Sequence, residues 1–289
     1  AEISTDDGRH RIRRLRPYRT SENLIKGVVV SYTDVTNLQE ARASARRREA
    51  QQEAVADLGR LALSGAELQD VLDLAVRELS EHMNVRFTKV LQLEPDGGRL
   101  TLRAGVGWTE ATVGESTVGT GIESQAGYTL QQRSAVVVKD FREERRFTAP
   151  RLLKDHHILC GASVIIGPND APWGVLGVHE SDPDRCGFDA DDINFLQATS
   201  NVLWLMIARS RAMENIEEER RQLRDMADSL PILFAVIDAD QRYEFVNKAY
   251  EFWGRTADEI EGMRVSDLVN PEAYKLVAPH VAGALRGEE

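Results

Sequence analysis

The sequence predicts an α+β fold in which an antiparallel sheet has helices on one face. Short runs rich in Val, Ile and Leu, bounded by Gly or Pro, are typical of strands and are grouped in the middle of the chain. Stretches rich in Ala, Arg, Glu and Gln lie before and after them, without Gly or Pro, as is typical of helices. Because the strands follow one another instead of alternating with helices, we expect antiparallel pairing.

The first 36 residues predict a β-hairpin. The runs RHRIRRLRPY and IKGVVVSYTDV have strand composition and are separated by TSENL, which suits a turn. Residues 1–50 are basic, with 11 Lys and Arg against 7 Asp and Glu. We interpret these arginines as the solvated face of a strand and expect no nucleic-acid binding, because only Tyr18 lies nearby to stack on a base.

The centre of the chain, residues 55–208, contains the elements of one complete domain. AELQDVLDLAVRELSEHM predicts an amphipathic helix. FTKVLQLEP and GGRLTLRAG predict a hairpin, and further strands are expected at SAVVVKD, GASVIIG and WGVLGVHE. A helix of about 40 residues follows from Asp189 and ends before Pro231.

The second half of that long helix predicts pairing with a second copy of the chain. Its apolar positions narrow to a seam interrupted by two arginines: Met206, Arg209, Met213, Ile216, Arg220, Leu223 and Leu230. We therefore expect a homodimer through helices 37–62 and 191–230. Beyond Pro231, ILFAVID and RYEFVN predict two more strands, followed by short helical pieces.

The central block resembles the GAF family of ligand-sensing domains over about 150 residues. The segments that carry the resemblance occur in the family's order: AVADLGRLALSGAELQDVLDLAVRELSEHM, LEPDGGRLTLRAGVGW, STVGTGIESQAGYTL, VVVKDFREERRF, LLKDHHILCGASVIIG, WGVLGVHES and FDADDINFLQATSNVL. FDADDINF lacks the family's cyclic-nucleotide signature, and Cys160 follows His156 and His157 instead of preceding them. The resemblance therefore implies neither a cyclic nucleotide nor a covalently attached bilin.

Both ends of the chain resemble parts of PAS domains. The last segment resembles an N-terminal half, with Asn247 expected to cap a helical piece and Gly262 to form a turn. The opening resembles a C-terminal half, in which Asp34 and Thr36 are expected to fix the exit of the last strand into the next helix. We interpret the chain as an excised piece, and one hypothesis is that the two halves complement each other.

The resemblances imply the PAS-GAF-PAS region of a bacterial multidomain sensor, a two-component histidine kinase or a related signalling protein. The expected domains are a C-terminal PAS half at 1–36, a signalling helix at 37–54, a GAF domain at 55–208, a coiled-coil helix at 209–230 and an N-terminal PAS half at 231–289. In this interpretation a small molecule or a redox change at the GAF pocket shifts a dimeric helix pair and so controls a downstream output domain.

No catalytic activity is expected of this region. None of the six histidines lies in the seam helices, and neither a glycine-rich ATP-binding segment nor a cyclase or phosphodiesterase motif occurs. Ser163 lacks the context of a nucleophile elbow. His156 and His157 are adjacent and point opposite ways in an extended segment, so no metal site is expected.

The composition of the chain indicates the cellular compartment in which the protein is expected. The formal net charge is -11, there is no apolar run long enough to span a membrane, and no apolar stretch follows the N-terminal charges. We expect no membrane insertion. Cys160 and Cys186 are too few for a disulfide framework or a four-ligand zinc site, so we expect reducing cytosol.

A ligand pocket remains as the candidate site. The side chains expected to line it are Trp108, Tyr128, Phe147, His157, Cys160 and His179. The alternative for each is an ordinary core or surface position, and Cys160 is either a redox-sensing thiol or a small buried hydrophobic residue. The alternative function is that the GAF domain is a ligand-free dimerisation spacer and that sensing belongs to the PAS domains.

Overall fold

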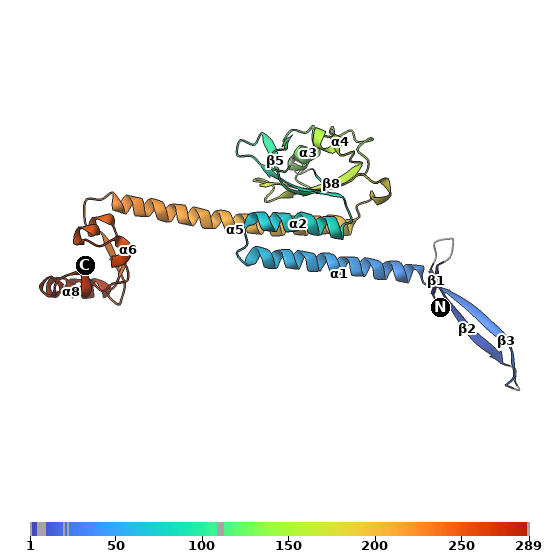
Figure 1. Ribbon diagram of the computed structural model, residues 1–289, viewed down its shortest axis with the longest axis horizontal. Coiled ribbons are helices and arrows are strands. Elements are labelled where there is room, and N and C mark those ends of the chain that lie inside the picture. The colour runs from blue at the N-terminus through green and yellow to red at the C-terminus, as the bar shows by residue number, and fades with distance from the viewer. Residues whose placement is uncertain (1, 5–9, 20, 22, 109–112, 288–289) are drawn as a thin grey trace. The chain divides into compact units, whose positions relative to one another are not determined.

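The computed structural model describes residues 2–4, 10–19, 21, 23–108 and 113–287. The chain divides into two compact units, Ala1–Ala208 and Arg209–Glu289 (Figure 1). In the part of the chain that is described, no helix is both long enough and apolar enough to cross a membrane.

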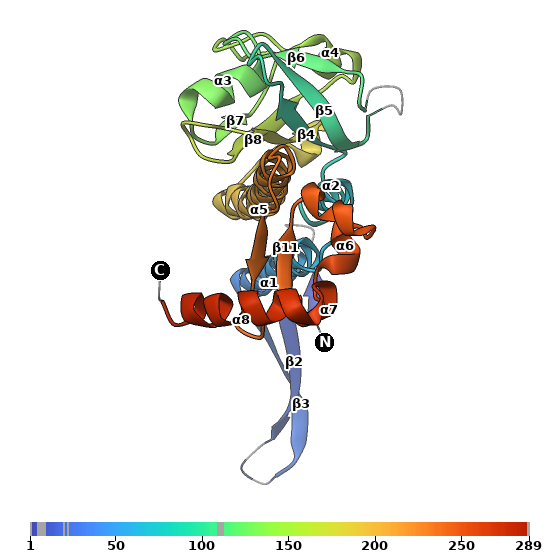
Figure 2. The ribbon, with the colours of Figure 1, turned by 90° about the vertical axis from the view of Figure 1, so that its left-hand side faces the viewer.

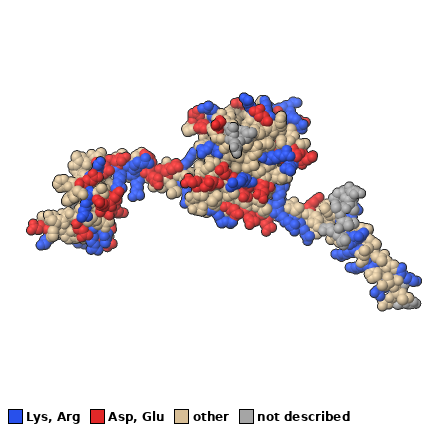
Figure 3. Space-filling model, viewed as in Figure 1, with Lys and Arg blue, Asp and Glu red and all other residues tan. Residues whose placement is uncertain are grey.

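The N-terminal residues form the predicted hairpin with one added strand. β1 (Glu2–Ser4), β2 (His10–Arg19) and β3 (Ile25–Asp34) pair antiparallel in that order. The backbone N–H and the hydroxyl of Thr36 both donate to Oδ1 of Asp34, at 3.0 and 2.7 Å. The same hydroxyl accepts a bond from the backbone of His10. The expected roles of Asp34 and Thr36 at the strand exit are thus confirmed. The arginines of the hairpin lie along β2, whereas the basic residue of β3 is Lys26; Lys and Arg are the blue atoms in Figure 3.

The centre of the first unit is a six-stranded antiparallel sheet. Its order is β6 (Thr117–Gly119), β5 (Arg99–Val106), β4 (Phe87–Leu93), β9 (Gly174–Glu180), β8 (Cys160–Ile166) and β7 (Val136–Val138). The two central strands, β4 and β9, are largely buried because neighbours cover both of their edges and layers cover both of their faces.

Helices cover both faces of this sheet. On one face lie α2 (Leu68–His82) and the first half of α5 (Ala190–Asp228), with α1 (Thr36–Leu63) packed on α2 (Figures 1 and 2). On the other face lie the short helices α3 (Gln125–Gln132) and α4 (Arg151–Asp155) with their connecting loops. The α+β prediction is confirmed, and the expectation of helices on one face omitted α3 and α4. These two helices enclose the second face.

The sheet divides the interior into two apolar clusters. The larger contains the inward faces of α1, α2 and α5 and alternate strand residues such as Val90, Val164 and Leu176. The smaller lies between the sheet and the α3–α4 side, and includes Leu91, Leu102 and Trp108. Alternation along the strands places successive residues in different clusters, so a strand residue in the second cluster faces the enclosed side.

The first turn of α5 is bound to α1 by ion pairs. Oδ1 of Asp189 accepts from the backbone of Asp192, and Oδ2 of Asp192 accepts from the backbone of Asp189. The backbone bond from Asp192, followed by the charge of Arg47, lowers the pKa of Asp189. Arg47 pairs with Asp189 and Asp192, and Arg48 donates to Asp191 at 2.6 Å. α1 and α5 are therefore connected at the point where the chain leaves the sheet.

The second unit continues from α5 into a small α+β fold. β10 (Ala235–Ile237) and β11 (Tyr243–Val246) pair antiparallel and are followed by η3 (Lys248–Trp253), α6 (Ala257–Ile260), α7 (Val265–Leu268) and α8 (Pro271–Leu285). Gly262 follows α6 with φ +86°, as the turn prediction required.

Asn247 has a different role from the predicted helix cap. It stands at the start of η3, but its buried side chain makes no bond to that helix. Its amide nitrogen donates to the carbonyl oxygens of Ala227 and Ile232, and its Oδ1 accepts from the backbone of Phe234. The capping prediction was wrong because tertiary contacts satisfy this amide first. Asn247 instead connects the end of α5 to the strands that follow through side-chain hydrogen bonds.

Candidate functional site

A row of paired residues crosses the enclosed face of the sheet. Lys89 in β4 lies opposite Gly105 in β5 and Gly177 in β9, and Gly177 lies opposite Ser163 in β8. A Cβ atom at Gly105 would overlap the ring of Trp108. A Cβ at Gly177 would lie 3.1 Å from Cε1 of His179 and 3.4 Å from Cε of Lys89. The glycines therefore leave room for three large polar or aromatic side chains on the sheet surface.

Lys89 is buried beside Trp108. Its side chain is 4% exposed, and Nζ lies 5.3 Å from the centroid of the Trp108 ring. Among the described residues it makes no ion pair. Loss of water around the ammonium lowers the pKa of Lys89 to about 7. The ring face of Trp108 offers the cation only partial compensation.

His179 has a ring nitrogen without a partner. It is fully buried, and its Nε2 lies 3.0 Å from Oε1 of Gln125. Nε2 of Gln125 donates to the carbonyl oxygen of Val136, so Oε1 is the atom that accepts and Nε2 of His179 carries the proton. Nδ1 is then a bare acceptor, and it has no hydrogen-bond partner in the described structure. Burial, and then the charge of Lys89, lower the pKa of His179 well below its ordinary value.

Aromatic rings form a continuous wall around these two side chains. Trp108 contacts Phe87 and His156, with centroids 5.1 and 4.9 Å away, and its Nε1 donates to the carbonyl oxygen of Thr88. Further rings continue the wall through His179, Phe141, Phe147 and Tyr128. Lys89 and His179 are almost completely buried behind these rings, and burial strengthens charge interactions.

Four of the predicted pocket residues belong to this wall. Trp108 and His179 lie together, with ring centroids 6.1 Å apart. Tyr128 and Phe147 form a pair 5.3 Å apart, with the guanidinium of Arg146 over both rings. Phe141 joins the two groups. Whether these residues contact a ligand stays a prediction.

The prediction for His157 was wrong. This residue follows α4 with φ +53° and its side chain is exposed. Its neighbour His156 packs on Trp108 instead, and its Nδ1 lies 2.9 Å from the carbonyl oxygen of Leu152. The left-handed backbone conformation at His157 turns the chain, so His156 packs on the aromatic wall and His157 does not.

The prediction for Cys160 was also wrong. Gly161 and Ser163 face the enclosed side, so alternation places Cys160 on the opposite face of β8. It is fully buried and bonded to Cys186 in a disulfide, so it is neither a free thiol nor a pocket residue. Two cysteines make no framework, but here they make one cross-link, so the cysteine count no longer argues for reducing cytosol.

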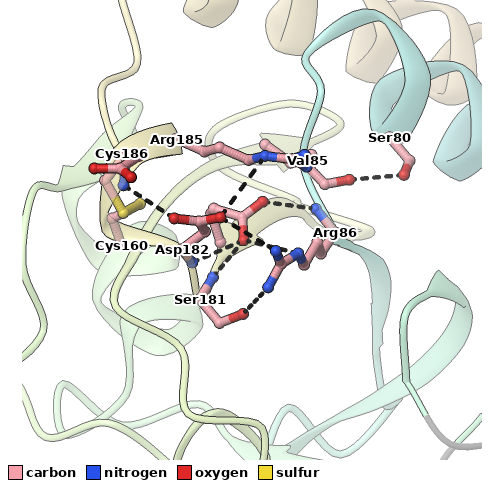
Figure 4. A network of polar contacts seen from close by, with 10 residues as sticks. Ser80, Val85, Arg86, Cys160, Ser181, Asp182, Arg185 and Cys186 are labelled. Atoms are coloured by element: carbon pink, nitrogen blue, oxygen red, sulfur yellow. Dashed lines mark hydrogen bonds and ion pairs between the residues drawn. A yellow bond between two sulfur atoms is a disulfide. The ribbon is translucent and has the colours of Figure 1, made fainter.

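The disulfide belongs to a polar network before α5 (Figure 4). The buried carboxylate of Glu180 accepts from the backbone N–H groups of Arg86, Ser181 and Asp182, at 3.0, 2.7 and 2.9 Å. The guanidinium of Arg86 donates to Ser181 and Asp182. Asp182 caps the short helix η2 (Pro183–Arg185), and Cys186 follows it. The network and the disulfide thus hold the segment that leads into the first turn of α5.

Two residues of the site, Lys89 and Gln125, were not predicted from the sequence, and His156 was considered only as the alternative to His157. Lys89 alternates with Phe87 and Leu91 in FTKVLQL, and the face that these residues share is turned inward. A lysine on the inward face of a central strand was the available signal. Gln125 gave no signal, because only the tertiary structure brings α3 over β9. Groups of three or more His, Cys, Asp or Glu side chains able to hold a metal ion do not occur among the described residues.

Comparisons with known proteins identify similar domains. A family model for the GAF domain matches residues 67–207, and a model for the PAS fold matches residues 227–289. The N-terminal hairpin has no such match here and remains a predicted PAS half. No curated protein matches the chain significantly.

Solved structures similar to the first unit include three GAF domains. One from a Coxiella burnetii phosphoenolpyruvate-protein phosphotransferase is 16% identical with a TM-score of 0.52, and the match covers 58% of this chain and 98% of that one. One from an Acinetobacter phosphoenolpyruvate-protein phosphotransferase is 22% identical with a TM-score of 0.49, covering 57% and 97%. A phycocyanobilin-bound GAF domain from a cyanobacterial phytochrome is 16% identical with a TM-score of 0.47, covering 56% and 96%. The first of these establishes the fold.

Proposed function

From the premise that residues 67–207 form a GAF domain and residues 227–289 a PAS fold, we propose that this chain is the sensory region of a signal-transduction protein. The GAF domain binds a small molecule on the enclosed face of its sheet. Binding changes the packing of α1 and α5 in a dimer, and α5 carries the change onward. The region is not itself an enzyme, and the output it controls is a two-component histidine kinase in the cytoplasm.

The observation that carries the proposal is the unpartnered Nδ1 of His179 next to the buried ammonium of Lys89. Lys89 has no counter-ion among the described residues, and Nδ1 of His179 has no hydrogen-bond partner there. Buried polar groups are nearly always paired, and leaving one unpaired costs about 1–3 kcal/mol. A bound molecule that satisfies both groups would remove that cost, which supports a ligand site.

The route of the signal is supported by the continuity of α5. The helix runs from Ala190 to Asp228 without interruption. Its first half packs on the sheet through Phe195, Leu203 and Ile207. Near its end, within the second unit, the carbonyl oxygen of Ala227 accepts a hydrogen bond from Asn247. A rigid helix is able to transmit a small shift over its length, provided that its two ends have alternative packings.

The direct test of ligand binding is native mass spectrometry of the gently purified chain. We expect a mass in excess of the polypeptide that disappears when the protein is denatured. If the protein carries no excess mass, and no compound in a broad metabolite set raises its melting temperature, ligand sensing by this domain is contradicted.

The dimer prediction concerns the exposed seam of α5. In a single chain Met213, Ile216 and Leu223 are 53%, 65% and 66% exposed, as expected of residues that a second copy covers. Ile216→Lys is therefore expected to weaken dimerisation at least tenfold, measured by light scattering on dilution. Arg220→Leu is expected to strengthen it. Asp225→Lys, on the opposite side of the helix, is the control and should leave it unchanged. Equal effects of the two lysine substitutions would overturn the seam assignment.

A second candidate is that the PAS unit does the sensing and the GAF domain is a spacer. A groove of about 630 Å³ in the second unit favours it, lined mainly by apolar side chains that include Leu223, Phe234 and Phe245. This volume is in the range of small-molecule sites. Truncation after residue 208 separates the two, since a ligand of the GAF domain should still bind the shorter chain.

Redox sensing is the third possibility, supported by the Cys160–Cys186 disulfide. Exchange with a small thiol such as glutathione would convert the disulfide into two protein thiols and leave the small thiol oxidised. The segment before α5 would then lose one of its two attachments.

A further inference from the structure

We propose that Lys89 and His179 together bind a small hydroxy carboxylate, with its carboxylate on the ammonium of Lys89 and its hydroxyl on Nδ1 of His179. The inference rests on the proposed function, because it names the chemistry of the molecule that the GAF pocket takes. The two side chains lie next to each other over Gly177, where a Cβ would come within 3.1 Å of Cε1 of His179 and 3.4 Å of Cε of Lys89.

The buried ammonium of Lys89 favours binding of an anionic ligand. A buried cation without a partner is unfavourable, and a carboxylate within hydrogen-bond distance restores its charged form. No described carboxylate does so here. Glu180 lies on the other face and bonds to three backbone N–H groups, and Glu144 is paired with Arg146. The ligand is therefore expected to supply the negative charge.

The unprotonated Nδ1 of His179 favours a ligand that has a hydrogen-bond donor. Because Oε1 of Gln125 accepts a hydrogen bond from Nε2–H of His179, Nδ1 of His179 carries no proton and can only accept. An ammonium donor on the ligand would stand close to the ammonium of Lys89 and be repelled. A hydroxyl carries no charge and donates equally well, so a hydroxy acid fits better than an amino acid.

The aromatic wall limits the rest of the ligand. Trp108 lies beside Lys89 and His179, and the ring of Phe141 is nearly parallel to that of His179, with centroids 6.3 Å apart. These apolar ring surfaces favour a short aliphatic group next to the two polar ones. Lactate has these three features and serves as the probe.

The test compares lactate with two molecules of nearly the same shape. Propionate lacks the hydroxyl, and lactamide lacks the charge. With the full chain at pH 6.5, calorimetry should detect lactate binding, about tenfold weaker binding of propionate, and no binding of lactamide. Affinity for lactate should fall by up to tenfold per pH unit above pH 7, because neutral Lys89 loses its charge for the carboxylate.

Two variants assign the roles. Lys89→Met should weaken lactate and propionate at least tenfold, whereas Lys154→Met, at an exposed lysine of α4, should change neither. His179→Phe should abolish the preference for lactate over propionate while both remain bound. Circular dichroism and a cooperative melting transition confirm that each variant is folded.

The outcomes separate this inference from the proposed function. If native mass spectrometry finds a bound neutral or cationic molecule, or if Lys89→Met binds lactate as the wild type does, the hydroxy carboxylate is wrong although the domain still senses a ligand. If neither lactate nor any other compound binds, both fail. A crystal structure with only water on Lys89 and Nδ1 of His179 at saturating lactate also overturns the inference.

Discussion

Replacing Lys89 by Met is expected to stabilise the ligand-free GAF domain by about 3–5 kcal/mol at pH 7. Burial lowers the pKa of this lysine from 10.5 to about 7, and lowering a pKa by one corresponds to about 1.4 kcal/mol of lost stability for the charged form. Met has a similar length and carries no charge, so the penalty disappears. For a unit of this size the Tm should rise on the order of 10 °C in differential scanning calorimetry.

The pH dependence of this effect has a definite sign. In the unfolded chain Lys89 titrates near its ordinary value of 10.5, and in the folded chain near 7. Between these values the unfolded chain binds more protons, so the wild type gains stability as pH rises and loses it as pH falls through 7. The advantage of the Met variant should shrink from pH 7 to pH 10.

Neighbouring titratable groups do not change the expected pH dependence of stability between pH 7 and pH 10. Among the described residues, the titratable groups in ring contact with Trp108 are His179 and His156. His179 has its pKa held well below its ordinary value, so its own effect is a loss of stability below about pH 6.5. Lys154→Met is the control and should have no such profile. A Met variant that is less stable than the wild type at pH 7 would mean that the ammonium has a stabilising partner.

Cleaving the Cys160–Cys186 disulfide is expected to destabilise the first unit by about 3–4 kcal/mol. The bond closes a loop with a sequence separation of 26, and the chain-entropy model gives this size for such a loop. The Tm should fall on the order of 10 °C under a phosphine reductant. Amide exchange in the first turn of α5 should also increase, because the segment 181–189 loses an attachment.

The matched control is Cys160→Ser combined with Cys186→Ser. This variant should melt at the lower temperature with or without reductant, and thiol labelling should confirm two free thiols in the reduced wild type. An unchanged Tm after complete reduction would exclude the disulfide as a constraint on α5 and remove the support for redox sensing.

The secondary structure followed from the sequence because hydrophobic periodicity and Gly or Pro boundaries were clear. The helix predicted from Asp189 to Pro231 is α5, and the strands around PDGG are β4 and β5. These features depend on local spacing alone. Gly262 was predicted correctly for the same reason, since a turn after a short helix requires a positive φ.

The site was predicted only in part, because its residues meet through strand register and loop conformation. Trp108 and His179 were identified as large polar or aromatic residues near expected pocket segments. His157 failed because one left-handed residue decides which of two adjacent histidines faces inward. Cys160 failed because the register of β8 turns it toward the helices. Lys89 was overlooked because nothing local shows that both of its cross-strand neighbours are glycines.

We propose that an occupied GAF pocket changes the state of α5. Hydrogen–deuterium exchange of the full chain, with and without saturating lactate, tests it most directly. We expect slower exchange in β4, β9 and α3 and altered exchange in α5 beyond residue 190, both absent from Lys89→Met. Exchange that is unchanged in α5 while the pocket strands are protected, or unchanged throughout, would contradict the claim.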